Sequence, residues 1–123
     1  MANDVETAVD TYVRAWSEHD PARRAQMIES CFAATGRIVT RSREIRGRVA
    51  LANEMTRFLE DPQTVGVRVI SAIDARGTTF RFRTLVERRD GTKLEAFDAG
   101  EIDANGQISV LLTFAGPLGE ISP

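Results

Sequence analysis

The stretch from Leu94 to Phe114 places the strongest constraint on the fold of this chain. Apolar and polar residues alternate along it, and Asn105-Gly106 stands near its middle. This dipeptide is the strongest short-range signal of a tight hairpin turn. The stretch therefore predicts two antiparallel strands joined by a two-residue loop. Residues two apart on a strand share a face, so the apolar face of the first strand carries one acid, Asp98.

The periodicity of the chain changes once, after the first half. The first half shows helical spacing of apolar residues and predicts three helices: one ending near His19, one beginning at Pro21 and one beginning at Gly47. A short strand is expected over residues 37–41. In the second half the apolar residues alternate, and a further hairpin signal stands at Asp90-Gly91. Helices followed by strands are typical of an α+β fold with segregated layers.

Length and composition limit the class of protein. The 123 residues, 42% of them hydrophobic, suffice for one domain over 1–123, with a core at about 5–115 and an irregular tail at 116–123. A net charge of −2 argues against nucleic-acid or polybasic membrane binding. No apolar run or leader suggests a membrane partner, so we expect a cytoplasmic protein. One Cys and one His make no ligand cluster, so we expect no metal or cofactor.

The loop at Asp90-Gly91 decides which side chains accompany Asp98. A two-residue loop would place Arg83 opposite Asp98 on a wet face. A three-residue loop with Gly91 in the left-handed conformation would place Thr84 there. We prefer the second register because it separates apolar from charged residues. It puts three apolar side chains on the face of Asp98, those of Phe80, Phe82 and Val86. It pairs Arg81 with Glu101 on the other face.

The Asn105-Gly106 loop sets the register of the last two strands. It places Leu111 opposite Gly100 and Thr113 opposite Asp98.

Two surface features suggest partners. The outer face of the last two strands is also apolar, and a monomer would leave it wet, so we expect a homodimer through Phe97, Val110, Leu112 and Phe114. Four arginines lie within the segment Arg41–Arg48. This segment is either a cradle for an anionic ligand or a solvated loop.

Three segments of the chain resemble a known superfamily: YVRAWSEHD, FAATGRIVTRSREIRG and FDAGEIDANGQI. Together with the three helices, they look like the nuclear-transport-factor-2-like (NTF2-like) superfamily, and within it like SnoaL-like polyketide cyclases and ketosteroid isomerases. The similarity covers roughly Val5 to Phe114. It implies a cone-shaped, cystatin-like α+β fold, in which three N-terminal helices pack on a curved antiparallel sheet around a deep apolar pocket. Members are often dimeric through the outer face of the sheet.

The resemblance also implies site residues. Tyr12 matches the tyrosine of the oxyanion hole in the isomerases, and Asp98 matches its protonated aspartic partner. An apolar site keeps such an acid neutral, so that it can donate a hydrogen bond. Thr40 stands where the isomerases have an aspartate as general base, and a threonine cannot shuttle a proton as a carboxylate does.

Two functional hypotheses follow. In the first, the protein binds an apolar carbonyl compound and acts as an isomerase or cyclase, with Asp98 and Tyr12 as catalytic residues and no identified base. In the second, it is a non-catalytic small-molecule-binding or dimerisation module, and Asp98 is a structural acid satisfied by Tyr12 or Thr113. The residues expected to contact the ligand are Trp16, Thr40, Met55, Phe80, Phe82, Leu111 and Thr113.

Overall fold

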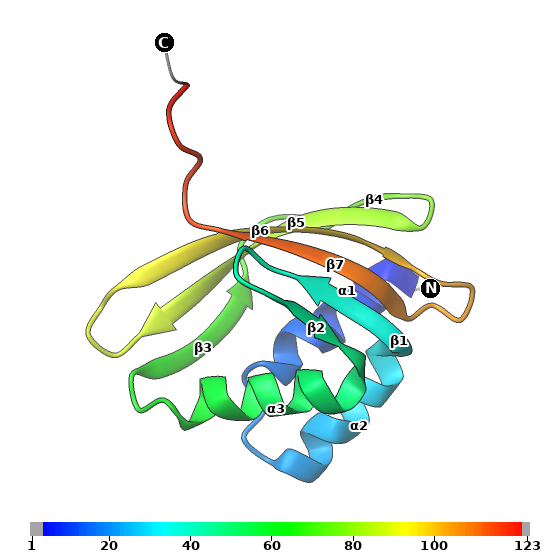
Figure 1. Cartoon of the computed structure of the whole chain (residues 1–123), viewed down its shortest axis with the longest axis horizontal. Coiled ribbons are helices and arrows are strands. Elements are labelled where there is room, and N and C mark those ends of the chain that lie inside the picture. The colour runs from blue at the N-terminus through cyan, green and yellow to red at the C-terminus, as the bar shows by residue number, and fades with distance from the viewer. Residues whose placement is uncertain (1–3, 122–123) are drawn as a thin grey trace.

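The structure is a computed structural model that describes residues 4–121 (Figure 1). Three helices precede most of the strands: α1 (Asp4–Ala15), α2 (Pro21–Cys31) and α3 (Gly47–Glu60). The strands are β1 (Phe32–Val39), β2 (Glu44–Arg46), β3 (Thr64–Val69), β4 (Asp74–Arg76), β5 (Thr79–Arg88), β6 (Lys93–Ile102) and β7 (Ile108–Ala115). Asp20 caps α2 by accepting a hydrogen bond from the Ala22 backbone N–H at 3.1 Å, and Pro21 follows at the first helical position, where it needs no N–H partner.

The strands form one curved sheet in the order β2-β1-β7-β6-β5-β3, and β4 pairs with β5. Figure 1 shows the three helices together beneath the sheet, which bends over them. The predicted α+β fold with helices on one face is confirmed. The sheet is mixed, however, because β1 runs parallel to β7 while the other pairs are antiparallel.

The first strand begins earlier than its sequence pattern indicates. β1 starts at Phe32, directly after α2, and passes through Gly36 without ending there. The register between β1 and β7 shifts in this region. A Cβ at position 36 would lie 2.8 Å from the Phe32 ring. Glycine is therefore needed at position 36 because the irregular strand folds closely over the Phe32 side chain. Gly36 lies within the strand and does not mark a loop.

The β5–β6 hairpin has the predicted face but not the predicted register. Its loop has three residues, 89–91, closed by a 3.1 Å bond from Arg88 N to Thr92 O, with Gly91 at φ +88°. Phe82 pairs with Asp98 in place of Thr84. The loop is centred one residue earlier than predicted. Each residue of β6 therefore pairs with a β5 residue two positions earlier than predicted, and a shift of two positions leaves every side chain on the predicted face of the sheet. The predicted pairing of Arg81 with Glu101 is therefore wrong, and Arg81 contacts Asp74 at 2.8 Å.

The β6–β7 hairpin has the predicted register but not the predicted loop. Asp98 pairs with Thr113, and Gly100 pairs with Leu111. The loop has three residues, 104–106, closed by a 2.8 Å bond from Asp103 N to Gln107 O. A register shift between Glu101 and Ile102 compensates for the longer loop. One extra residue in a bulge changes the pairing by one position, which here restores the expected pairs.

The core lies between the helices and the concave face of the sheet. α1 turns Val5, Ala8, Val9, Tyr12 and Val13 towards the strands, all at most 6% exposed. On the sheet, Phe80 packs against Gly100, where a Cβ would lie 2.9 Å from the Phe80 ring and 2.2 Å from the Val110 carbonyl oxygen. This close packing is possible because Gly100 has no side chain. None of the helices in residues 4–121 is long and apolar enough to cross a membrane.

Candidate functional site

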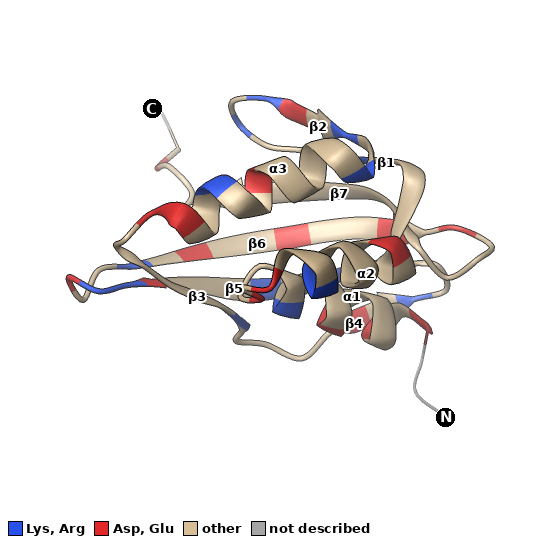
Figure 2. Cartoon of the chain, turned by 90° about the horizontal axis from the view of Figure 1, so that it is seen from below, with Lys and Arg blue, Asp and Glu red and all other residues tan. Residues whose placement is uncertain are grey.

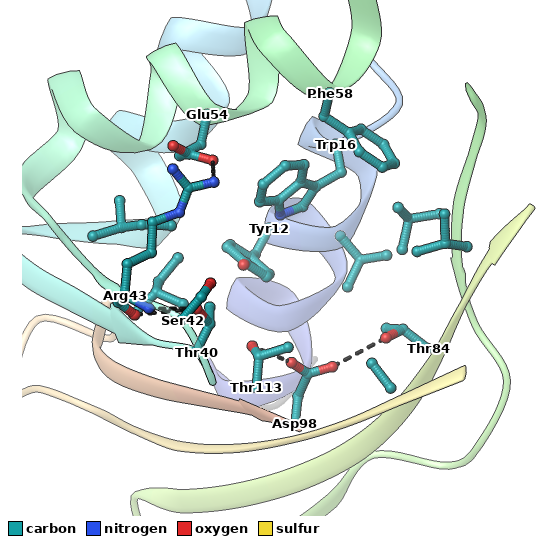
Figure 3. A pocket seen from close by; sticks show the side chains of 16 residues that line it. Tyr12, Trp16, Thr40, Ser42, Arg43, Glu54, Phe58, Thr84, Asp98 and Thr113 are labelled. Atoms are coloured by element: carbon teal, nitrogen blue, oxygen red, sulfur yellow. Dashed lines mark hydrogen bonds and ion pairs between the residues drawn. The ribbon is translucent and has the colours of Figure 1, made fainter. Parts of the chain in front are cut away.

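A cavity of about 250 Å³ lies between α1, α3 and the concave face of the sheet. Most of its wall is apolar, and a few polar side chains converge on it (Figure 3). Such a combination is characteristic of small-molecule sites. The cavity is lined by Tyr12, Val13, Trp16, Ile38, Thr40, Ser42, Arg43, Ile45, Glu54, Phe58, Val67, Thr84, Val86, Ala96, Asp98 and Thr113.

Asp98 lies on the sheet side of this cavity and is only 4% exposed. Its Oδ1 accepts a hydrogen bond from Thr113 Oγ1 at 2.6 Å, and its Oδ2 accepts one from Thr84 Oγ1 at 3.1 Å. Figure 3 shows the carboxyl group held between the two hydroxyls. Three neighbouring strands, β5, β6 and β7, thus supply one polar group each. We call Tyr12, Thr84, Asp98 and Thr113 the buried end of the cavity.

Burial raises the pKa of Asp98, while the hydrogen bonds from Thr113 and Thr84 act in the opposite direction. Burial dominates because a charge loses its hydration in apolar surroundings, and two hydroxyl donors replace only part of it. Asp98 is thus easier to protonate than a surface aspartate.

Tyr12 faces the cavity from α1 and is 6% exposed. Burial raises the pKa of Tyr12 far above its usual value near 10, and the nearby Asp98 raises it further. The phenol is therefore protonated at neutral pH and available as a donor. Trp16 packs edge-on against Tyr12 at 6.4 Å between ring centres and against Phe58 at 5.2 Å, which builds an aromatic wall beside the buried end.

Thr40 lines the cavity, but its hydroxyl is engaged in the turn between β1 and β2. It donates to the Arg43 carbonyl oxygen at 3.1 Å and accepts from the Arg43 backbone N–H at 3.3 Å. These bonds close the turn over Arg41 and Ser42. The position that resembles the isomerase base thus stabilises a local backbone conformation.

An ion-pair cluster lies at the other side of the cavity. Arg43 Nη2 contacts Glu54 Oε2 at 2.7 Å, and Arg57, one turn further along α3, also pairs with Glu54. The Glu54 side chain is 12% exposed, against 56% for Arg43 and 62% for Arg57. Figure 2 shows basic segments of the β1–β2 turn beside charged segments of α3. We call Ser42, Arg43 and Glu54 the rim of the cavity.

The four arginines of the Arg41–Arg48 segment do not converge. Arg43 reaches the rim, while Arg46 pairs with Glu44 on the strand surface at 3.0 Å. Arg48 points away from the cavity and donates to the Phe32 carbonyl oxygen at 2.8 Å. Arg41 is exposed at the turn. A cradle formed by all four side chains is therefore excluded, because they lie on different sides of the β1–β2 hairpin and of α3.

The predicted ligand-contacting residues fall into two groups. Trp16, Thr40 and Thr113 line the cavity, as do the proposed catalytic residues Asp98 and Tyr12. The other four are absent from the cavity wall and pack in the core, each at most 4% exposed: Met55, Phe80, Phe82 and Leu111. The cavity occupies only one end of the concave face, so residues with the correct orientation on the strands are covered by helices elsewhere.

Four residues of the cavity wall were not predicted as site residues from the sequence: Ser42, Arg43, Glu54 and Phe58. Arg43 was considered only as one of four arginines in the Arg41–Arg48 segment. Glu54 had a detectable signal, since it lies three residues after Leu51 and four before Phe58, on the apolar side of α3. Ser42 and Arg43 lie in a turn, where no periodicity indicates which side chain points inwards.

Other reactive groups lie outside the cavity wall. Cys31 is 1% exposed in the core, and burial raises the pKa of its thiol to about 12, so the thiolate is not populated at neutral pH. His19 is exposed after α1. Within residues 4–121, no group of three His, Cys, Asp or Glu side chains is placed to hold a metal ion.

No protein-family model matches this chain, and no curated protein matches its sequence significantly. Solved structures do match its fold. A proposed isomerase of the SnoaL-like family from Agrobacterium tumefaciens strain C58 superposes with a TM-score of 0.81 at 22% identity, over 93% of this chain and 98% of that one. A protein with a cystatin-like fold from Methylobium petroleophilum PM1 gives a TM-score of 0.78 at 17% identity, over 95% and 79%.

A third structure contains a small molecule. The protein from Catenulispora acidiphila DSM 44928 has a ketosteroid isomerase-like fold, was solved in complex with trimethylamine, and gives a TM-score of 0.68 at 16% identity, over 87% of this chain and 83% of that one. At these identities the matches establish the fold alone. The chain has the cystatin-like, NTF2-like fold that its sequence resembles, which confirms the fold prediction.

Proposed function

We propose that the cavity binds an apolar small molecule through a carbonyl group, with Asp98 and Tyr12 as donors to the carbonyl oxygen. The observation that supports this most is the placement of both side chains on one largely apolar cavity, each buried to at least 94%. Burial raises the pKa of both groups, which favours their protonated, donating forms. A donor in dry surroundings polarises a carbonyl more strongly than a donor in water.

The same arrangement supports catalysis of the SnoaL-like isomerase or cyclase type. Hydrogen bonds from Asp98 and Tyr12 would stabilise negative charge that develops on the carbonyl oxygen, and Thr84 and Thr113 keep the carboxyl group in place. The isomerase description of the Agrobacterium tumefaciens protein is consistent with this chemistry. In this proposal Asp98 and Tyr12 are the catalytic residues.

A second candidate is a binding module without catalysis. One observation favours it: the hydroxyl of Thr40 closes its own turn, so the position of the isomerase base carries no proton acceptor of carboxylate strength. The trimethylamine complex of the Catenulispora acidiphila protein is consistent with ligand binding in this fold. In this second candidate function, the cavity binds the same class of ligand but catalyses no reaction.

Thermal unfolding with a panel of steroid enones, aromatic polyketides and simple aryl ketones tests the proposal. A ligand at 100 times its Kd adds roughly 2.7 kcal/mol of stability, which corresponds to a rise in Tm of about 10 °C for a domain of this size. Any ligand found is then followed for turnover. The Asp98→Asn and Tyr12→Phe variants are expected to weaken binding or turnover, and Thr92→Val, outside the cavity, serves as the control. No shift with any compound would contradict both candidates.

We also propose a homodimer through the outer face of the sheet. Phe97, Leu112 and Phe114 are 40%, 37% and 57% exposed on adjacent strands, and Val110 lies beside them, partly buried. Ion pairs such as Arg83 with Glu95 flank this apolar strip. An apolar centre with a charged border resembles protein interfaces.

Light scattering coupled to size-exclusion chromatography measures the oligomeric state. The wild type is expected at twice the chain mass at micromolar concentration. The double variant Phe97→Glu/Phe114→Glu is expected to be monomeric, whereas Val49→Glu, which alters an exposed residue of α3, is expected to keep the dimer. A monomeric wild type would contradict the proposal.

A further inference from the structure

The ion-pair cluster at the rim of the cavity, formed by Arg43, Glu54 and Arg57, carries more positive than negative charge. Two guanidinium groups, from Arg43 and Arg57, share the single carboxylate of Glu54. Among residues 4–121 these are the ion pairs that the three side chains make. The cluster of three therefore has a formal excess of one positive charge next to an apolar wall.

The geometry also shows which guanidinium is available to a ligand. Arg43 lines the cavity, whereas Arg57 does not. The Arg43 side chain engages Glu54 through Nη2 alone, and an arginine has five N–H donors. Its other donors remain for a further acceptor. If Arg43 turns towards a ligand, Glu54 keeps Arg57 as its partner, so a partly buried carboxylate is not left unpaired.

The neighbours of Arg43 suit an anion. Ser42 adds a hydroxyl to the same wall from the turn between β1 and β2. Figure 3 shows Arg43 rising from this turn to Glu54, across the cavity from Tyr12 and Trp16. The hydrogen bonds of Thr40 to the Arg43 backbone fix the base of this side chain. Carboxylate recognition by arginine favours such a held position, because its planar fork binds two oxygens at once.

We propose that the ligand is an apolar carboxylic acid that also has a carbonyl group, bound with its carboxylate at Arg43 and its carbonyl at the buried end. This inference rests on the proposed function, because it concerns the same cavity. It adds the charge of the ligand and its orientation. The rim and the buried end share one largely apolar cavity, and each receives one polar end of the molecule. An uncharged ketone uses the buried end alone and leaves the excess positive charge of the Arg43–Glu54–Arg57 cluster uncompensated.

Isothermal titration calorimetry with matched probes tests the inference. The probes are 3-benzoylpropanoate, 4-benzoylbutanoate and 5-benzoylpentanoate, each compared with its methyl ester. The series varies the distance between ketone and carboxylate, and the ester keeps the shape while removing the charge. For at least one length, the acid is expected to bind about tenfold more tightly than its ester, the gain typical of one charge-assisted hydrogen bond.

Two arginine variants identify the group responsible. Arg43→Gln is expected to abolish the preference for the acid over its ester. Arg43→Lys keeps the charge but not the fork and is expected to retain part of the preference. Arg57→Gln is the matched control: it removes a charge from the same carboxylate outside the cavity wall and is expected to retain most of the preference. Far-UV circular dichroism checks that the variants are folded.

The outcomes separate this inference from the proposed function. Equal affinity for acid and ester at every length would overturn the inference and leave the carbonyl site standing. An equal loss in Arg43→Gln and Arg57→Gln would also overturn it, because the preference would then come from diffuse charge. Binding of none of the acids or esters would contradict the proposed function and this inference with it.

Discussion

The buried end and the rim of the cavity hold their acids in opposite ways. Asp98 is surrounded by strands and receives two neutral hydroxyl donors. Glu54 lies on a helix and receives two guanidinium groups that are more than half exposed. In the first case burial sets the energetics, and in the second case the solvent screens much of the charge. The buried end thus has the larger effect on stability, and the proposed preference for a charged ligand comes from the rim.

The largest effect on stability is expected at Gly100, two residues along β6 from Asp98. Gly100→Ala would place a Cβ 2.2 Å from the Val110 carbonyl oxygen. Because a backbone atom cannot move aside without disturbing the β6–β7 pairing, we expect a loss of roughly 3 kcal/mol in the free energy of unfolding. Urea denaturation measures it. Gly119→Ala, where no atom lies within 4 Å, is the control and should be neutral. Equal stability of the two variants would show that the sheet yields easily here.

A smaller loss is expected from the hydrogen bond at Asp98 Oδ1. Thr113→Val keeps the shape but leaves a buried oxygen without its 2.6 Å donor, at a cost of about 1–3 kcal/mol. Thr92→Val removes a hydroxyl bond of the same length, 2.6 Å, from the exposed Asp90. It is the matched control and should cost clearly less. Similar losses in chemical denaturation would contradict the claim that burial controls the energetics of the Asp98 site.

The pH dependence of stability separates the Asp98 site from surface acids. Since burial raises the pKa of Asp98 in the folded protein, the folded state binds its proton more tightly than the unfolded state. Stability from this group is therefore present below the unfolded value near 3.8 and is lost as pH rises to the folded value. The slope is at most about 1.4 kcal/mol per pH unit.

Subtraction of the Asp98→Asn variant isolates this effect. Asp74, Glu87 and Asp90 have lowered pKa values, caused mainly by hydrogen bonds from Arg81, Arg68 and Thr92 respectively. Their contributions have the opposite sign but occur in both proteins. The difference in unfolding free energy between wild type and variant should therefore fall as pH rises above 3.8 and then become constant. A difference independent of pH in guanidinium titrations would refute the raised pKa.

The smallest effect on stability is expected at the rim. Arg43→Gln and Arg57→Gln each remove one exposed ion pair to Glu54, and such pairs contribute about 0–1 kcal/mol. Each variant leaves the other arginine on the carboxylate. The double variant should lose more than the sum of the two, because Glu54 is then left partly buried and unpaired. Thermal unfolding of the three variants measures this, and simple additivity would mean that Glu54 is effectively solvated.

The sequence predicted the buried end better than the rim, and the reason is periodicity. Alternation along β6 and β7 identified Asp98 as the acid of an apolar face and Thr113 as its partner. The predicted register of β5 was wrong by two positions, but an error of two positions preserves the face of the strand. Thr84 was therefore predicted on the same face as Asp98, and in the structure it donates a hydrogen bond to Asp98. Because strand alternation determines which face a side chain occupies, local sequence patterns were sufficient to predict which side chains of three strands meet at this site.

The rim and the extent of the cavity could not be predicted in this way. Arg43 comes from a turn and Glu54 from a helix, and their contact depends on how α3 packs across the sheet. Phe80 and Phe82 likewise have the correct face but lie buried in the core and outside the cavity wall. Orientation on a strand is a local property, whereas exposure to a cavity depends on the helices above it.

The parallel pairing of β1 with β7 has a consequence for the order of folding. These two strands come from opposite parts of the sequence, yet they are neighbours in the sheet. Closing the long intervening segment costs chain entropy before the pair contributes any contacts. During synthesis on the ribosome, β1 can pair with β2 early, but its other edge has no partner strand until β7 emerges, and Asp98 has no Thr113 partner until then. The cavity is among the last parts of the molecule to form, so nascent chains that lack β7 should neither bind ligand nor resist proteolysis.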